Sequence, residues 1–378
     1  MSQKDNKLKV AFIGHKRIPS REGGVEIVVE ELSTRMAKKG LDVTVYNRKC
    51  GLSNKQNVKL AVNKTYKGVK INSALTINTK GLAAITSSLF AGIGAAFSNF
   101  DVVHFHAEGP CAALWIPKLF GKKCIATIHG LDHQRAKWGK FASAYIKLGE
   151  KCAVRFADEI IVLSSNLQNY FLEKYGRKTV FIPNGINAAE QKSADIIQKE
   201  YGLKKDDYIL FLARLVPEKG LEYLINAFKN VKTDKKLIIA GAASDTQEYA
   251  ECLYKLAQAD NRIQFVGFVE GEKLAELYSN AYLYVLPSNL EGMPISLLEA
   301  MSYGNCCLVS DIPENLQVIE DKGISFKKGN QEDLAKTIQS LCDDNAKVLK
   351  YKKASAEYIT EKYNWDDVVD ATLKLYGG

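Results

Sequence analysis

The chain has 378 residues, of which 46% are hydrophobic and 25% are charged, the composition of a soluble globular protein rather than a disordered or fibrous one. Its net charge of +9 is unevenly distributed, because residues 1–180 carry 29 Lys and Arg against 13 Asp and Glu, whereas residues 181–378 carry 23 against 30. We therefore expect the two halves of the chain to meet different partners.

A basic half could meet nucleic acid, anionic lipid or a phosphorylated acceptor. The lysines between residues 55 and 80 are dispersed and, apart from Tyr66, lack the interleaved aromatic side chains typical of a nucleic-acid-binding surface. We therefore expect no nucleic acid as partner and favour an anionic membrane surface or a lipid diphosphate. A scattered basic surface that serves only solubility is the open alternative.

The eight cysteines are scattered, mostly within apolar runs, and no two have the spacing of metal ligands. Reduced core cysteines of this kind are typical of cytoplasmic proteins. The first residues, MSQKDNKLKVAFIG, contain no apolar run long enough for a signal peptide. We expect a cytoplasmic protein, with peripheral association at the inner face of the plasma membrane if the basic half binds lipid.

In chain order, residues 9–14 predict a buried strand, followed by a helix from residue 25 to residue 38. Gly23 and Gly24 stand at the start of this helix, and their missing side chains would let the backbone approach a phosphate closely. Residues 82–97 are apolar nearly all round but too few to cross a bilayer. They predict a buried helix, with partial insertion into a membrane interface as the alternative.

Two further predicted strands, residues 101–106 and 123–129, each end in a histidine. The carboxyl ends of parallel strands are where doubly wound sheets bind ligands. His129 is followed by an unusually polar and aromatic segment that contains Asp132, Arg135 and Trp138. A lone histidine at such a position is more often structural, so the strand end alone does not assign its role.

The alternation of strands and helices begins again at residues 208–212, after a Pro-Asn-Gly turn at residues 183–185. Arg214 and Lys219 follow this strand, in the strand-end loop and the N-terminal turn of the next predicted helix, where the helix dipole disfavours cations. An anionic ligand would remove this conflict, and an ion pair of Arg214 with Glu218 is the structural alternative.

Residues 288–311 carry the strongest signal in the chain. A buried strand at residues 281–286 is followed by a loop and by Pro294, which suits the first position of a helix. The backbone N–H groups from Gly292 to Ser296 are then available to a phosphate. Glu299, one turn inside, could accept hydrogen bonds from a ribose diol, and Glu291 could reach other hydroxyls. The structural alternative is a capped surface helix in which Glu291 and Glu299 are solvated and bind no ligand.

The run from Glu291 through Pro294 to Glu299, EGMPISLLEAM, followed by Gly304, resembles the signature of the family-4 glycosyltransferases of the GT-B fold. This chain departs from the usual pattern at Ala213, where the family often has Gly, and after Gly304. The resemblance implies an α/β fold with two Rossmann-like doubly wound domains that face a central cleft. The expected boundaries are residues 1–182 for the acceptor-binding domain, 183–205 for a linker, 206–345 for the nucleotide-sugar domain, and 346–378 for helices that cross back.

The resemblance also assigns roles to individual residues. The catalytic group would be His129, Glu291, Arg214 and Lys219, with His129 and Glu291 at the donor sugar. The donor would further be bound by Gly23, Gly24, Gly292, Met293, Pro294 and Glu299, with Glu299 at the ribose. The segment after His129 looks like that of a subgroup acting in bacterial polysaccharide assembly, which makes Asp132, Arg135 and Trp138 acceptor candidates. Glu26, one turn into the first predicted helix, is a further acceptor candidate.

The expected reaction transfers a hexose-type sugar from a nucleotide diphosphate sugar, preferably a UDP-sugar, to a glycan or lipid-linked saccharide. No Asp-x-Asp motif or metal-binding His/Cys cluster is visible in the sequence, so we expect neither a metal nor another cofactor. Family-4 enzymes mostly retain the anomeric configuration, whereas inversion would require a base such as Glu26 or Asp132. A sugar-nucleotide epimerase of the same fold and a non-catalytic nucleotide-sugar-binding protein are the alternatives.

Overall fold

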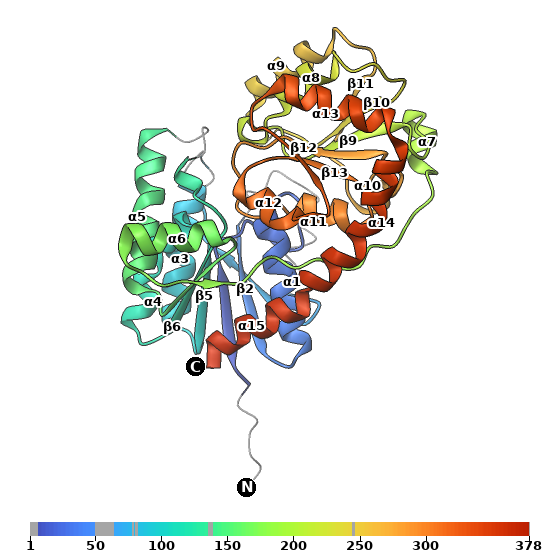
Figure 1. Ribbon diagram of the computed structural model, residues 1–378. Helices are drawn as coiled ribbons and strands as arrows, with labels where there is room; N and C mark the ends of the chain where they lie inside the picture. Colours follow the sequence, from blue (N-terminus) through green and yellow to red (C-terminus); the bar gives the residue numbers. More distant parts are fainter. Residues whose placement is uncertain are drawn as a thin grey trace. The chain divides into compact units, whose positions relative to one another are not determined.

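The computed structural model describes residues 7–49, 64–77, 79, 82–134, 139–243 and 246–377 (Figure 1). The chain forms two compact units. Unit 1 contains Met1–Asn184 together with Trp365–Gly378, and unit 2 contains Gly185–Asn364. The predicted C-terminal region, residues 346–378, is therefore divided between the units.

Unit 1 is built on an eight-stranded sheet with the order β3-β4-β2-β1-β5-β6-β7-β8. All neighbouring strands pair in parallel except β3 and β4. The strands are β1 (Lys9–Ile13), β2 (Asp42–Arg48), β3 (Thr65–Tyr66), β4 (Val69–Ala74), β5 (Val102–His106), β6 (Lys123–Ile128), β7 (Glu159–Val162) and β8 (Val180–Phe181). Since the strand order reverses between β1 and β5, the ligand-binding edge expected of such a sheet lies where these two strands end.

Helices connect these strands. They are α1 (Gly24–Lys38), α3 (Leu82–Ala96), α4 (Trp115–Leu119), α5 (Lys140–Phe156), α6 (Ser165–Tyr175) and α15 (Trp365–Gly377), with short 3-10 helices η1 (Gly109–Ala113) and η2 (Asp132–Gln134). The central strands are buried along nearly their whole length, as expected of parallel strands covered on both faces.

Helix α15 comes from the far end of the chain but belongs to unit 1. It packs on α1, where Arg35 forms an ion pair with Asp366 at 2.6 Å and Lys39 forms one with Asp370 at 2.6 Å. Its fully enclosed Tyr376 hydroxyl lies 2.6 Å from Nδ1 of His104 on β5. The last helix of the chain thus helps to cover the central strands of the first unit.

Unit 2 is a second doubly wound domain with an entirely parallel sheet of order β11-β10-β9-β12-β13-β14. The strands are β9 (Tyr208–Leu212), β10 (Lys236–Ala240), β11 (Ile263–Gly267), β12 (Leu283–Leu286), β13 (Cys307–Ser310) and β14 (Ile324–Phe326). The order reverses between β9 and β12. The expectation of an α/β protein with two Rossmann-like sheets is therefore confirmed.

The helices of unit 2 enclose a continuous apolar core that includes Phe211, Leu224, Phe228 and Leu308. They are α7 (Ile196–Tyr201), α8 (Leu221–Phe228), α9 (Gln247–Ala257), α10 (Gly271–Asn280), α11 (Ile295–Ser302), α12 (Pro313–Ile319), α13 (Gln331–Asp343) and α14 (Asn345–Lys362), with the 3-10 helix η3 (Pro217–Lys219). Helix α11 begins at Ile295, so Pro294 is the residue before the helix rather than its first residue.

The helix predicted at residues 82–97 is present as α3, but the expectation that it is buried was wrong for one of its faces. Helix α3 buries its small residues, including Ser88, Ala91, Gly92 and Ala95, and leaves its large apolar side chains partly exposed. Small residues allow close packing, and a Cβ at Gly92 would lie 3.4 Å from the backbone oxygen of Ala113. Among the described residues, no helix has both the length and the apolar character needed to cross a membrane.

Candidate active site

The loop after β9 is held against the loop after β12 by close backbone contacts. Gly220 has φ +63°, and a Cβ there would lie 2.2 Å from the backbone oxygen of Pro287. Gly241 after β10 similarly lies against the Ala213 carbonyl, which a Cβ would approach to 1.9 Å. The backbone N–H of Asn289 also donates to the Glu218 oxygen at 2.8 Å. These contacts place Lys219 beside the residues that follow β12.

Lys219 and Glu291 form the centre of this edge of the sheet. Lys219 Nζ lies 2.5 Å from Oε1 of Glu291, and only 13% and 8% of the two side chains are exposed. The hydroxyl of the fully buried Ser288 donates to the same oxygen at 2.6 Å. Hydrogen bonds to ionised groups are stronger than neutral ones, so the Glu291 carboxylate is held in one orientation by two donors.

Helix α11 starts immediately beyond this pair. Its first intrahelical hydrogen bond runs from the N–H of Leu297 to the Pro294 oxygen, which leaves the N–H groups of Ile295 and Ser296 ahead of the helical ladder. Such a helix start favours anions through its dipole and its N–H donors. The predicted residues Gly292, Met293 and Pro294 are all buried in the turn that leads into it.

Two buried tyrosines contact α11, one at the predicted ribose contact Glu299 and the other at Ser296. The Tyr278 hydroxyl donates to Oε2 of Glu299 at 3.2 Å, and the Tyr284 hydroxyl donates to Oγ of Ser296 at 2.9 Å. Burial raises the pKa of both phenols well above the usual value, so both remain neutral donors. Arg214 lies two residues beyond β9 and is partly buried. The structure thus brings the predicted donor residues of unit 2 to one edge of its sheet.

In unit 1, His129 lies at the end of β6 against a second histidine. Nδ1 of His106, the last residue of β5, lies 3.0 Å from Nε2 of His129. His106 is fully buried, and its ring stacks on Phe12 and contacts the ring of His104. Burial and the neighbouring histidines lower the pKa of His106 well below its usual value, so a neutral His106 orients the His129 ring.

Glu26 lies near the carboxyl end of β1, but its carboxylate turns toward its own loop. Oε1 accepts the backbone N–H of Lys16 at 2.9 Å. A Cβ at Gly23 would lie 2.4 Å from Oε2 of the same side chain. Gly23 is the extended residue that precedes α1, and Gly24 is the first residue of that helix. The two glycines and Glu26 therefore form one packed helix start.

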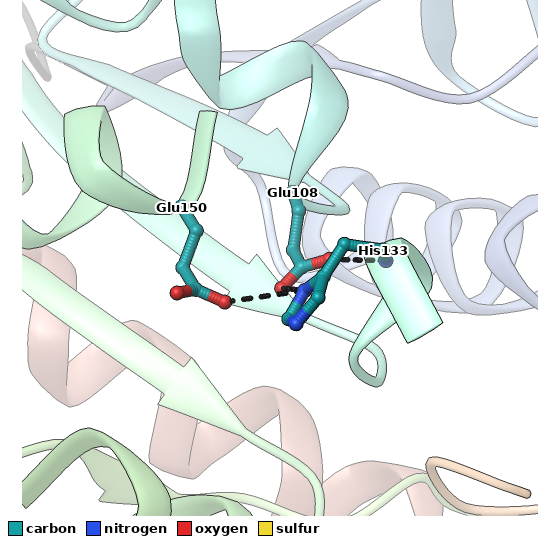
Figure 2. Close-up of side chains that lie close together, drawn as sticks. All are labelled: Glu108, His133 and Glu150. Atoms are coloured by element: carbon teal, nitrogen blue, oxygen red, sulfur yellow. Dashed lines mark hydrogen bonds and ion pairs between the residues drawn. The ribbon is translucent and has the colours of Figure 1, made fainter. Parts of the chain in front are cut away.

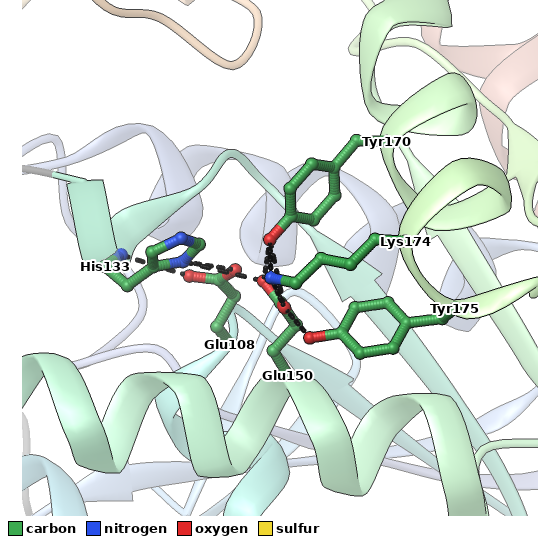
Figure 3. A network of polar contacts seen from close by, with 6 residues as sticks. All are labelled: Glu108, His133, Glu150, Tyr170, Lys174 and Tyr175. Atoms are coloured by element: carbon green, nitrogen blue, oxygen red, sulfur yellow. Dashed lines mark hydrogen bonds and ion pairs between the residues drawn. The ribbon is translucent and has the colours of Figure 1, made fainter.

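A group of polar residues that sequence reasoning missed lies beside the acceptor candidate Asp132. Glu108 follows β5, Glu150 lies on α5, and His133 lies on η2, and their side chains point toward one another (Figure 2). Among the described residues, this is the group that could hold a metal, since its ligand atoms lie within 4.8 Å of one another. Tyr170, Lys174 and Tyr175 of α6 converge on Glu150 from the other side (Figure 3).

The remaining acceptor candidates, Arg135 and Trp138, lie outside the described residues. The residues that sequence reasoning missed are mostly contacts of predicted ones, namely Ser288, Tyr278, Tyr284, His106, Glu108 and Glu150. Of these residues, only His106 could have been found from the sequence, because it stands at the end of a predicted strand, as His129 does. The others stand in strands, helices or strand-end loops where nothing in the sequence distinguishes a buried polar contact from an ordinary surface residue.

Comparison with known proteins supports the two-domain reading. The model of the family described as Glycosyltransferase Family 4 matches residues 22–190, and that described as Glycosyl transferases group 1 matches residues 193–363. The chain therefore belongs to the family-4 glycosyltransferases of the GT-B fold, and it is a glycosyltransferase.

Three similar proteins illustrate the relationship. An uncharacterised glycosyltransferase of Methanocaldococcus jannaschii is 25% identical, with 98% of each chain covered. The Anabaena protein HepE, solved in complex with UDP and glucose, aligns with a TM-score of 0.80 and 18% identity over 97% of this chain and 98% of its own. WaaG, a glycosyltransferase involved in lipopolysaccharide biosynthesis, aligns with a TM-score of 0.77 and 15% identity, covering 98% of this chain and 100% of its own.

Proposed function

We propose that this glycosyltransferase moves a hexose-type sugar from a UDP-sugar to a glycan or lipid-linked saccharide in bacterial polysaccharide assembly. The observation that carries the proposal is the cluster of Lys219, Glu291 and Ser288 beside the start of α11, with Glu299 one turn further on. This cluster stands at the switch point of a doubly wound sheet, where nucleotides bind in such folds.

Each residue then has a definite task. Arg214, Lys219 and the N–H groups that open α11 stabilise the charge on the leaving diphosphate. Glu299 accepts hydrogen bonds from the ribose, and Glu291 orients the donor sugar. In unit 1, we assign His129 to the donor sugar and Gly23 and Gly24 to the diphosphate. The acceptor is assigned to Glu26, Asp132, Arg135 and Trp138.

We further propose that the reaction retains the anomeric configuration and needs no metal for leaving-group departure. Two cationic side chains and a helix start can balance a diphosphate without a divalent ion. An inverting reaction would need a base, and Glu26, one of the two candidates, is buried and already accepts the Lys16 N–H. A UDP-sugar is the favoured donor because HepE, which shares the fold, was solved with UDP and glucose.

The acceptor proposal includes a cytoplasmic enzyme bound peripherally to the inner face of an anionic membrane. It is supported by exposed apolar side chains that α3 and α4 present in a basic half of the chain, Phe90, Phe97, Trp115, Leu119 and Phe120. The rings of Phe97 and Phe120 lie 4.7 Å apart, so the exposed apolar side chains that follow the two helices meet each other. Surfaces of this kind with nearby lysines bind anionic interfaces.

The donor site is tested by thermal shifts with UDP, GDP, ADP and dTDP and their sugars, because a ligand of the folded state raises its melting temperature. We expect a shift with UDP and UDP-sugars. The variants Glu299→Ala and Arg214→Ala should weaken UDP binding by about 10- to 100-fold, since hydrogen bonds to charged groups contribute about 1.5–3 kcal/mol. Glu332→Ala, which removes an exposed carboxylate from the first turn of α13, is the matched control and should bind UDP normally.

Two outcomes would contradict the proposal. If no nucleotide raises the melting temperature, the donor site is misassigned and transfer from a nucleotide sugar is contradicted. If NMR of a UDP-sugar incubated alone shows conversion to an epimer, the reaction is not transfer. The membrane part has a separate test, cosedimentation with phosphatidylglycerol vesicles at low salt, in which Phe97→Glu and Phe120→Glu should reduce binding; unchanged binding would contradict the role of this surface.

A further inference from the structure

Two carboxyl groups lie face to face inside unit 1. Glu108 and Glu150 are both completely buried. Ala107 before Glu108 has φ +73°, an unusual conformation for a residue other than glycine, which turns the chain sharply after His106. Gly149 lets α5 approach, since a Cβ there would lie 1.9 Å from the backbone oxygen of Glu108. The positive φ of Ala107 and the missing side chain of Gly149 thus both allow α5 to pack against the backbone of Glu108.

The two oxygens of Glu150 have different surroundings (Figure 3). Oε1 accepts from Lys174 Nζ at 2.9 Å, from the Tyr170 hydroxyl at 3.1 Å, and from the Tyr175 hydroxyl. Oε2 faces Nδ1 of His133 at 3.5 Å. The Tyr170 hydroxyl lies at 3.1 Å from Oε2 as well, so both oxygens meet α6, and Oε2 in addition faces His133.

His133 closes the group from η2 (Figure 2). Its Nδ1 lies 3.4 Å from Oε1 of Glu108, and its backbone N–H donates to Oε2 of Glu108 at 3.3 Å. Both the side chain and the backbone of His133 therefore meet a buried carboxyl. Asp132, the acceptor candidate, is the preceding residue in the same short helix.

The net charge of this group is zero when the two carboxyl groups together hold one proton. Lys174 forms an ion pair with Glu150 at 2.9 Å, and a neutral His133 contributes no charge. The ligand oxygens of the two buried carboxyls lie within 4.8 Å of each other. A second, uncompensated carboxylate in such a position is strongly unfavourable, so the pair holds one proton between them. Burial, followed by the hydrogen bond with Glu150, raises the pKa of Glu108 to about 10. Burial opposes ionisation of Glu150, but hydrogen bonds from Glu108, Tyr175 and Lys174 outweigh it and lower its pKa.

We propose that Glu108 and Glu150 share a single proton and act as positioning residues that hold His133, and with it Asp132, at the carboxyl end of β6. The part that concerns the acceptor rests on the proposed function, in which Asp132 contacts the acceptor. A divalent cation between the same three ligand atoms is the competing occupant. It would add two charges to a group that already contains Lys174, whereas a proton leaves the group neutral.

The titration of the pair involves groups on every element packed around it. These are Asp132 and His133 on η2, Lys147 on α5, Cys111 on η1, and Tyr170, Lys174 and Tyr175 on α6. Because the folded pKa of Glu108 lies above its unfolded value, its contribution to stability is complete below pH about 4.3 and declines as the pH rises toward 10. A permanently neutral residue at position 108 removes this decline.

The first experiment measures melting temperature from pH 6 to pH 9 for the wild type, Glu108→Gln and Glu150→Gln. Glutamine at position 108 still donates to Glu150, so this variant should be as stable as the wild type at pH 6 and lose less stability by pH 9. Glu150→Gln leaves Lys174 opposite a neutral amide and should have a lower melting temperature at every pH. Glu173→Gln, an exposed change on α6, should match the wild type throughout. An equal loss of melting temperature in Glu108→Gln and Glu150→Gln would overturn the proposal that the two carboxyls share one proton.

The second experiment distinguishes a proton from a cation. Elemental analysis of the purified protein should find no stoichiometric metal, and neither EDTA nor added Mn²⁺ or Zn²⁺ should change the melting temperature. A bound metal that disappears in Glu108→Gln would overturn the proposal and establish a cation site.

The third experiment tests positioning, with amide hydrogen exchange of a peptide that covers residues 129–134. His133→Ala should speed exchange at least tenfold, whereas His133→Asn, whose amide nitrogen can replace Nδ1, should restore slow exchange. UDP thermal shifts should be the same in both variants. Unchanged exchange in His133→Ala would overturn the positioning role, whereas a wild type that does not respond to UDP would instead contradict the proposed function.

Discussion

At the residue scale, carboxylates in similar positions have different roles because different hydrogen-bond donors surround them. Oε1 of Glu291 accepts from a side-chain cation and a buried hydroxyl, Lys219 and Ser288. Glu26, also near a helix start, accepts a backbone N–H of its own loop. The first arrangement orients an acid beside a helix N-terminus, and the second stabilises a local turn. An assignment of roles therefore depends on the donors that meet each oxygen.

Ser288 provides a direct test of this orientation. Ser288→Ala removes a hydrogen bond to an ionised group, an interaction worth about 1.5–3 kcal/mol, so kcat/KM should fall about 10- to 100-fold. Because this hydrogen bond is present in the free protein, the melting temperature should fall as well. Steady-state kinetics with the donor identified by thermal shift would measure this. Ser302→Ala is the control, because Ser302 is also buried but donates within α11 to the Glu299 backbone oxygen at 2.8 Å. Equal losses in both variants would contradict a specific role for Ser288.

At the element scale, the donor residues of unit 2 meet because two loops after neighbouring strands touch. β9 and β12 pair in parallel with Leu283 opposite Ile209 and Tyr284 opposite Leu210, so their carboxyl ends emerge together. Gly220 then lies directly against Pro287. The register of the sheet and one glycine thereby determine the distance between Lys219 and Glu291.

Gly220→Ala should separate these loops. Its cost has two parts, a left-handed backbone unfavourable by about 1–2 kcal/mol and a clash with the Pro287 oxygen. Gly329→Ala has only the first part, since φ is +72° and nothing lies within 4 Å of a Cβ there. We expect Gly220→Ala to melt about 4–8 °C below Gly329→Ala, from about 2 kcal/mol of additional strain, and to bind UDP about tenfold more weakly. Similar melting temperatures of Gly220→Ala and Gly329→Ala would show that the close contact of Gly220 with Pro287 does not constrain the loops.

At the scale of the whole molecule, the two units differ in how the chain builds them. Unit 2 is one continuous segment, Gly185–Asn364, with its own core and its own cluster of donor residues. Unit 1 needs the first 184 residues and the last helix, α15. That helix supplies the Tyr376 hydroxyl to His104 and two ion pairs to α1.

The fragments should therefore behave differently. A fragment of residues 185–364 should unfold in one cooperative transition and keep a thermal shift with UDP. A fragment of residues 1–184 should be unstable because the surface covered by α15 is exposed, and fusion of residues 365–378 through a flexible linker should restore cooperative unfolding. Calorimetry measures all three. A stable 1–184 fragment, unchanged by the fusion, would contradict the structural role of α15.

The sequence by itself determined the class of fold and most of the donor site. Alternating apolar strands and amphipathic helices have local periodicities, and the EGMPISLLEAM run places Glu291, Pro294 and Glu299 at a helix start through short-range chemistry. For this reason the two doubly wound sheets and the family were predictable. The roles of individual site residues in the reaction stay predictions until the variants are measured.

Only the tertiary structure decided which distant residues touch. Lys219 and Glu291 are 72 positions apart, and His104 and Tyr376 are 272 positions apart. Helix α3 is apolar on all sides, so its periodicity could not show that its small residues would pack and its large ones would remain exposed. Glu108 and Glu150 are ordinary glutamates in the sequence. They form a proton-holding pair only because sheet register, a positive φ at Ala107 and a glycine on α5 bring them together away from water, and none of these is a local property of the chain.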